Sequence, residues 1–196
     1  MVAQVIAGCI ISYLLGSIPF SYIIAKKVKG IDIRVTGEGN VGGRNVWHLV
    51  GKKYGVLAGF LDISKGYGAY WIGYLLGLSP WWIWLCGFCV VLGHNFPVFL
   101  KGRGGKGIAA AVGFLLGMQP LIILISGVLI GIIYFPFRKF HLAISIGIGS
   151  IPVLWFVVLK RPWEEILLLS ALLLSLGLKR IIDEPHMRKI KQESGW

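Results

Sequence analysis

The sequence predicts an all-α integral membrane protein with seven transmembrane helices. Three observations lead to this prediction: the hydropathy, the spacing of the apolar segments and the distribution of lysine and arginine. Of the 196 residues, 56% are hydrophobic and 14% are charged, and the mean hydropathy is +0.78. A soluble domain of this length has too little core to bury so much apolar surface, so part of that surface must face lipid.

The net charge of +12 narrows the class further. It results from 20 Lys and Arg residues against 8 Asp and Glu residues. A nucleic-acid-binding domain carries its basic residues on a soluble body, and the hydropathy of this chain does not fit that class. We therefore expect a lipid bilayer as a partner and no nucleic acid.

Prolines and charged gaps bound the apolar segments in order along the chain. The first segment is long enough to span a bilayer and lacks the short apolar region and cleavage site of a signal peptide. The fourth is the shortest, since its 14 residues span about 21 Å against a hydrocarbon core of about 30 Å. We expect one polytopic domain over residues 1–196, with helices at 2–25, 54–78, 81–100, 105–118, 120–137, 140–159 and 163–179.

The basic residues test this count of helices. With seven crossings, 17 of the 20 basic residues lie on one side, Lys160 and Arg161 lie on the other, and Lys65 lies within the second helix. Without the fourth crossing the split becomes 12 against 7. Because cytoplasmic loops are rich in Lys and Arg, seven crossings are favoured, with the amino terminus outside and the carboxyl terminus cytoplasmic. The cytoplasmic segments are then loops near 26–53, 101–104 and 138–139 and a tail over 180–196.

The first cytoplasmic loop is rich in glycine. Such a loop permits positive φ and leaves backbone N–H groups free to converge on an anion. Asn40 and Asn45 add amide donors, and Arg44 adds a guanidinium suited to phosphate. A turn-rich connector without a ligand is the alternative interpretation. The glycines are Gly37, Gly39, Gly42 and Gly43.

The second cytoplasmic loop leads directly into an apolar helix and is the sharper signal. It resembles a P-loop only superficially, because Gly107 follows Lys106 where Ser or Thr would hold magnesium. The amides of Gly104 and Gly105 at a helix N-terminus, together with Arg103 and Lys106, favour an anion site. A basic segment that only fixes orientation is the alternative.

Several ionisable residues lie at or near the membrane. Asp62 and Lys65 share a face of the second helix, where they form either a structural ion pair or a substrate contact. His94 at the end of the third helix is a candidate general base or an interfacial donor. His48 and His141 lie on the cytoplasmic side, where they could hold phosphate.

Six motifs together resemble those of the bacterial acyl-phosphate:glycerol-3-phosphate acyltransferases. They occur in the family's order and spacing and cover most of the chain up to about residue 118. The resemblance implies a seven-helix inner-membrane enzyme with its active site facing the cytoplasm. The motifs are LLGSIPFS at 14–21, KGIDIR at 29–34, GEGNVGGRN at 37–45, DISKG at 62–66, GHNFP at 93–97 and GGKG at 104–107.

The resemblance implies transfer of a fatty acyl group from acyl phosphate to the 1-hydroxyl of glycerol 3-phosphate. The products are lysophosphatidic acid and phosphate, in the first step of phospholipid biosynthesis. We expect Lys106, His94 and Asn45 to act in catalysis, and we expect a monomer without cofactor or metal. The phosphate-binding residues are then Gly39, Asn40, Gly42, Gly43, Arg44, His48, Arg103, Gly104, Gly105 and His141.

The chain departs from the family pattern at residues expected to touch substrate. Glu38 stands where the family usually has serine, and a carboxylate beside a phosphate site repels the phosphate unless a cation pairs with it. The departures leave open an acceptor other than glycerol 3-phosphate, or a non-catalytic protein that binds or transports lipid or anions. The others are Arg44 for threonine, His48 for arginine, Ala110 for threonine, His141 for serine, and the absence of the tail motif His-Arg-Glu-Asn.

Overall fold

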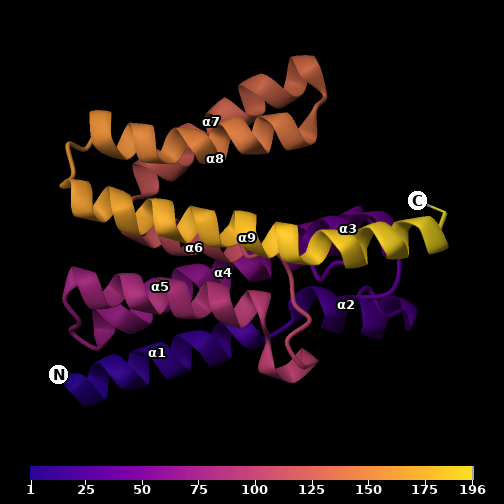
Figure 1. Cartoon of the computed structure of the whole chain (residues 1–196), viewed down its shortest axis with the longest axis horizontal. Coiled ribbons are helices and arrows are strands. Elements are labelled where there is room, and N and C mark those ends of the chain that lie inside the picture. The colour runs from indigo at the N-terminus through magenta and orange to yellow at the C-terminus, as the bar shows by residue number, and fades with distance from the viewer. Residues whose placement is uncertain (196) are drawn as a thin grey trace.

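The computed structural model describes residues 1–195, except for the side chains of residues 140 and 141. The described part is all-helical and contains no strand, which confirms the all-α part of the predicted fold class (Figure 1). Its helices are α1 (Val2–Ser17), α2 (Phe20–Lys29), α3 (Gly43–Leu49), α4 (Lys52–Leu75), α5 (Pro80–Asn95), the short 3-10 helix η1 (Val98–Leu100), α6 (Ile108–Met118), α7 (Pro120–Phe137), α8 (Phe140–Val157) and α9 (Trp163–Glu193).

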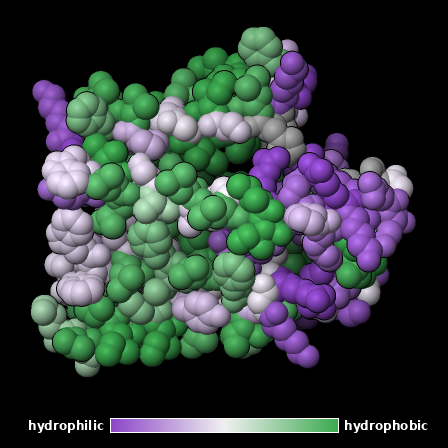
Figure 2. All heavy atoms as spheres, in the orientation of Figure 1, coloured by the Kyte–Doolittle hydropathy of each residue, from purple (hydrophilic) through white to green (hydrophobic). Residues whose placement is uncertain are grey.

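Three helical stretches of the described chain are long and apolar enough to cross a bilayer: Val2–Lys29, Pro80–Leu100 and Pro120–Phe137. Along α7, Leu124, Val128 and Ile132 recur every four residues, and each is 62% exposed. Such an apolar stripe on the outside of a helix is suited to lipid. Figure 2 shows the same division for the whole molecule, with an apolar body and a hydrophilic end.

The first predicted helix, 2–25, is interrupted in the structure. Ile18 has φ −65° and ψ 114°, an extended conformation that ends α1, and α2 begins two residues later. Pro19 explains the break, because proline disfavours the helical conformation of the residue before it. The side chain of Lys65 donates hydrogen bonds to the carbonyls of Gly16 and Ile18 at the break, at 2.9 and 3.1 Å. The prediction of one continuous helix was therefore wrong at this position.

The helices at the centre pack through glycine. A Cβ on Gly16 of α1 would collide with the carbonyl of Val90 on α5, and a Cβ on Gly66 of α4 would collide with the carbonyl of Ala110 on α6. These two helix pairs are therefore in contact backbone to backbone, as is typical of membrane bundles.

The α7–α8 hairpin forms a separate layer beside this centre (Figure 1). Its contact with the centre includes Trp155, which is fully buried and lies 6.1 Å from Trp84 of α5, ring centroid to ring centroid. The indole of Trp155 also donates a hydrogen bond to Glu165 at 3.3 Å. The hairpin is thus anchored near the end of α8 that precedes α9.

One predicted loop and the predicted tail contain helix. The segment 26–53 contains α3, and α9 continues from Trp163 to Glu193 through most of the predicted tail. Ion pairs at i, i+4 spacing support this extension, among them Lys179–Asp183 and Arg188–Glu184. The bounds of α6 also differ, because it begins at Ile108 rather than at residue 105.

Candidate active site

Three polar segments meet at the hydrophilic end of the molecule, where α2, α3 and the end of α9 lie (Figures 1 and 2). The ring of His186 on α9 hydrogen-bonds the carbonyl of Arg34 in the first loop at 2.9 Å. Ser194 donates to the carbonyl of Gly37 at 3.4 Å. The second loop joins them, because a Cβ on Gly105 would collide with the carbonyl of Val41. The fold therefore brings the two predicted loops together and adds α9 to them.

The side chain of Asn45 lies at the centre of the first loop and is fully buried. Its Nδ2 donates to the carbonyls of Ile33, Thr36 and Asn40 at 3.0, 3.1 and 3.0 Å. Its Oδ1 accepts from the amide of Glu38 at 3.0 Å. All polar atoms of this side chain are engaged by the loop, so the geometry favours a role in shaping the loop over contact with substrate.

The predicted glycines of this loop serve different purposes. Gly37 and Gly39 have φ of +64° and +63°, the left-handed region that glycine adopts without strain. Gly42 precedes the first turn of α3 in an extended conformation. Gly43 lies against α4, since its Cβ would be 2.9 Å from the carbonyl oxygen of Gly55.

Glu38 turns its carboxylate into the protein, where the side chain is 3% exposed. An ion pair joins its Oε1 to Nη1 of Arg44 at 3.3 Å. The two substitutions that depart from the family pattern are therefore partners, and the cation offsets the repulsion that a lone carboxylate would exert.

Lys106 belongs to the same electrostatic neighbourhood. Burial lowers the pKa of its amine, the positive charges of Arg180, Arg44 and Lys191 lower that pKa further, and the negative charge of Glu38 opposes them. A pKa shift with these causes indicates that several cations and one carboxylate surround this amine, an arrangement suited to binding a polyvalent anion.

The second loop rests on the end of α5. The amide of Gly105 donates to the carbonyl of His94 at 3.1 Å. A Cβ on Gly104 would collide with that carbonyl, and a Cβ on Gly105 would collide with the imidazole ring. Gly107, with φ of +79°, then leads into α6. Arg103 is exposed beside this loop.

Below the loop, the sequence-predicted pair Asp62 and Lys65 forms a buried ion pair of 2.9 Å. Oδ1 of Asp62 also lies 3.5 Å from Nδ1 of His94. His94 itself is 7% exposed. Asp62 therefore contacts both Lys65 and His94, and these three residues line neither of the cavities described next.

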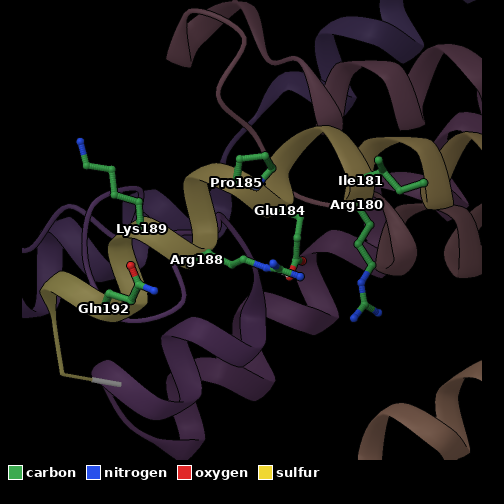
Figure 3. Close-up of a pocket in the computed structure, with 7 residues that line it drawn as sticks. All are labelled: Arg180, Ile181, Glu184, Pro185, Arg188, Lys189 and Gln192. Atoms are coloured by element: carbon green, nitrogen blue, oxygen red, sulfur yellow. Dashed lines mark hydrogen bonds and ion pairs between the residues drawn. The ribbon is translucent and has the colours of Figure 1, made fainter.

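Two cavities flank the end of α9. The larger has a volume of about 660 Å³ and is lined by residues of α9. Figure 3 shows how three of them lie: Arg180 points away from the ion pair that Glu184 forms with Arg188. The smaller, of about 320 Å³, is lined by Arg34, Gly39, Val41, Phe96, Gly102, Arg103, Gly104, Lys179, Ile182, Asp183 and His186. Both candidate loops therefore border the smaller cavity.

The contribution of α9 was missed in the sequence prediction. Lys179 is 4% exposed, lies 4.9 Å from the centre of the Phe96 ring, and donates to Asp183 at 2.6 Å. The i, i+4 spacing of Lys179 and Asp183 was a signal that the tail continues as a helix.

Of the predicted phosphate-binding residues, Gly39, Arg103 and Gly104 line the smaller cavity. The residues Asn40, Gly42, Gly43, Arg44 and Gly105 line neither cavity, and nor does the predicted catalytic residue Lys106. His48 is exposed on α3 and lines neither cavity. His141 falls in the first turn of α8, and its side chain lies outside the described residues. Among the described residues, no group of three or more His, Cys, Asp or Glu side chains is arranged to hold a metal ion.

The family profile described as glycerol-3-phosphate acyltransferase matches residues 6–191. A glycerol-3-phosphate acyltransferase of Aquifex aeolicus is 47% identical over 118 residues, which cover 60% of this chain and 61% of that protein. Another, of Dehalococcoides mccartyi, is 37% identical over 182 residues, covering 89% and 86%. A third, of Clostridioides difficile, is 33% identical over 188 residues, covering 93% and 88%. The chain thus spans about three fifths of the first of these relatives and most of the other two.

Two solved structures have the same fold. The crystal structure of PlsY, an integral membrane glycerol 3-phosphate acyltransferase, in its glycerol 3-phosphate form superposes with a TM-score of 0.83 at 34% identity, covering 94% of this chain and 92% of that one. The lysophosphatidic acid form gives 0.81 at 33% identity, with the same coverage. The fold is therefore that of an integral membrane protein, and the chain belongs to the glycerol-3-phosphate acyltransferase family.

Proposed function

We propose that the chain transfers a fatty acyl group from acyl phosphate to the 1-hydroxyl of glycerol 3-phosphate, releasing lysophosphatidic acid and phosphate. One observation carries the proposal: two basic, glycine-rich loops meet at a single polar end of an apolar bundle, beside the cations of α9. Both reactants carry phosphate and one carries an alkyl chain, so a cationic site at a membrane surface suits both. Membership of the family supports the same reaction.

In this mechanism the acceptor hydroxyl oxygen attacks the carbonyl carbon of the acyl phosphate. A new ester C–O bond forms, the C–O bond to phosphate breaks, and the hydroxyl proton passes to a phosphate oxygen. The mixed anhydride has a good leaving group, so catalysis rests on positioning and on stabilising negative charge. We assign that stabilisation to Lys106 and Arg44, and we propose that the reaction needs no cofactor or metal.

The remaining predicted site residues are proposed to act around these two cations. Gly39, Asn40, Gly42 and Gly43 shape the first loop, and Gly104, Gly105 and Arg103 shape the second. His94 and Asn45 are proposed to hold the loops. We retain His48 and His141 as candidate phosphate contacts.

We further propose one polytopic domain with seven crossings, formed by α1 with α2, then α4, α5, α6, α7, α8 and α9. The amino terminus is outside, and the loops near 26–53, 101–104 and 138–139 and the tail from residue 180 are cytoplasmic. The one-sided distribution of Lys and Arg supports this orientation. The active site then faces the cytoplasm from a bacterial inner membrane, and the protein acts as a monomer.

A fluorescent protein fused after residue 196 tests this orientation. The fusion should fluoresce if the carboxyl terminus is cytoplasmic, and a fusion that does not fluoresce would contradict the orientation.

The decisive assay for the reaction uses purified protein and palmitoyl phosphate. Phosphate release should require glycerol 3-phosphate. Lys106→Ala should reduce the rate by about 100-fold or more, as is typical when a donor to developing charge is removed. Undiminished turnover in this variant would remove Lys106 from the mechanism. Counterflow of labelled phosphate in liposomes, without acyl transfer, would favour a transporter instead.

A second candidate is the same transfer to a different acceptor. Glu38 motivates it, because a buried carboxylate beside Arg44 reduces the positive charge available to an acceptor phosphate. An acceptor screen decides between the two. Glycerol 3-phosphate as the best acceptor would eliminate this candidate, and an uncharged alcohol as the best would establish it.

A further inference from the structure

A buried polar cluster lies where α1, α2, α4 and α5 meet. Its centre is the ion pair of Asp62 and Lys65 on α4, whose side chains are 3% and 1% exposed. Both side chains are buried and engaged by protein groups, which favours a structural or positioning role over direct contact with substrate. Burying two charges in an apolar bundle costs free energy unless each charge is fully paired. The other contacts of Asp62 and Lys65 therefore matter as much as their mutual ion pair.

Lys65 fixes the break between α1 and α2. Its ammonium donates to the carbonyls of Gly16 and Ile18. At this break the amide of Phe20 donates to Ile18, so the carbonyl of Gly16 loses its helical partner. The ammonium of Lys65 also lies 5.9 Å from the centre of the Phe20 ring in the first turn of α2. Together with its bond to Asp62, these contacts satisfy a charge that water does not reach.

Asp62 extends the cluster toward α5. Its Oδ2 accepts a hydrogen bond from Ser21 of α2 at 3.4 Å. Its Oδ1, which is bonded to Lys65, also lies 3.5 Å from Nδ1 of His94. No hydrogen-bond partner for this Nδ1 is present among the described residues, so Asp62 is its polar neighbour. The carboxylate is therefore the polar group that faces Nδ1 of the imidazole ring.

His94 in turn packs directly against the second glycine-rich loop. Its carbonyl accepts the amide of Gly105 at 3.1 Å, and its ring and carbonyl leave no room for a Cβ on Gly105 or Gly104. Lys106 follows directly in the chain. A shift of His94 would therefore move the backbone that carries this cation.

We propose that Asp62 and Lys65 are positioning residues for the phosphate-binding loop. The pair holds His94, His94 holds Gly104 and Gly105, and these glycines set the place of Lys106. This proposal rests on the proposed function, in which Lys106 binds substrate phosphate. The position of Lys106 matters for the rate of the reaction, because misplacing a reacting group by about 1 Å can reduce a rate by about 100-fold.

The test separates positioning from mere stabilisation with two variants. Asp62→Leu leaves the ammonium of Lys65 buried without a counter-ion, so both folding and positioning should suffer. Asp62→Leu combined with Lys65→Met removes both charges and should recover part of the thermal stability lost in the single variant. Recovery is only partial because the carbonyls of Gly16 and Ile18 lose the donor on Lys65, and the double variant cannot restore the contact with His94. In the double variant we expect the KM for glycerol 3-phosphate to remain raised by about tenfold. Recovery of KM together with stability would overturn the proposal.

Hydrogen exchange gives a readout that needs no turnover. The amide of Gly105 should be protected by its bond to His94 and should exchange at least about tenfold faster in the double variant. Trp155→Phe is the matched control, because it alters a buried side chain far from the loop and should leave both loop exchange and KM unchanged. If the wild-type protein lacks transferase activity, the proposed function fails, yet loop exchange still decides the positioning. Unchanged exchange over 101–107 would refute it.

Discussion

The centre of the bundle and the α7–α8 hairpin are packed in different ways. In the centre, α1 and α5, and likewise α4 and α6, meet backbone to backbone at glycines. In the hairpin, Gly127 and Gly131 have open space where a Cβ would be, and large side chains such as Phe135 are exposed. The loops of the candidate site are attached to the centre. The backbone is therefore held in close contact in the part of the molecule that carries the proposed phosphate site. The hairpin, in contrast, exposes an apolar surface that is less tightly packed.

The largest expected effect follows from glycine replacement in the two regions. Gly66→Ala places a methyl group against the carbonyl of Ala110, so α4 and α6 must separate. Overpacking of this kind costs about 1–3 kcal/mol, and activity should fall with it. Gly131→Ala should leave activity unchanged and stabilise its helix by about 0.5–1 kcal/mol. Thermal denaturation in detergent checks both, and equal loss in the two variants would contradict the difference in packing.

Charge removal at the site gives a smaller effect. Glu38→Gln frees Arg44 from its carboxylate partner, so the affinity for substrate phosphate should rise and the KM for glycerol 3-phosphate should fall by about three- to tenfold. Glu165→Gln is the control, since Glu165 contacts Trp155 of the hairpin and Arg161. Its KM should match the wild type. A raised KM in Glu38→Gln would mean that the carboxylate helps to bind the acceptor.

The two regions also differ in how well sequence predicts them. The hairpin helix 120–137 was predicted with the bounds that the structure has, because uniform hydropathy, Pro120 at its start and the charged residues after its end determine such a segment. The last helix was predicted to end at residue 179, before a cytoplasmic tail, but α9 continues to Glu193, where contacts with distant residues help to stabilise it. Ile190, for example, packs against Gly39 of the first loop. The i, i+4 pairs Lys179–Asp183 and Glu184–Arg188 were the local signal for this extension, whereas the contacts that hold it against the first loop join residues distant in sequence and leave no local pattern.

The candidate site shows the same limit at the level of single residues. Glycine and basic residues identified both loops, and the resemblance identified the family. However, composition could not show that the polar atoms of the Asn45 side chain are all hydrogen-bonded to the loop backbone. Nor could it show that Asp62 contacts His94 from another helix. Both facts depend on the packing of segments distant in sequence, and both change the proposed role of a residue from contact with substrate to positioning.

The smallest expected effect is a pH dependence confined to the site. Burial lowers the pKa of Lys106 from its ordinary value of 10.5, and the nearby cations, Arg180 first among them, add to that effect. Only the protonated amine attracts phosphate, so the KM for glycerol 3-phosphate should rise as pH increases through the lowered pKa. The second pKa of a phosphate is about 6, so the substrate does not change its charge in this alkaline window.

Folding stability should respond to Lys106 in the opposite direction. Between the lowered pKa and 10.5, the unfolded chain binds more protons at this group than the folded chain does, so stability rises with pH while binding weakens. Lys106→Met should have a high KM that does not vary with pH over that window. Lys139→Met, at the exposed turn between α7 and α8, should keep the wild-type profile. A pH-dependent KM that survives in Lys106→Met would mean that another cation of the site titrates, which would assign the phosphate contact to that residue.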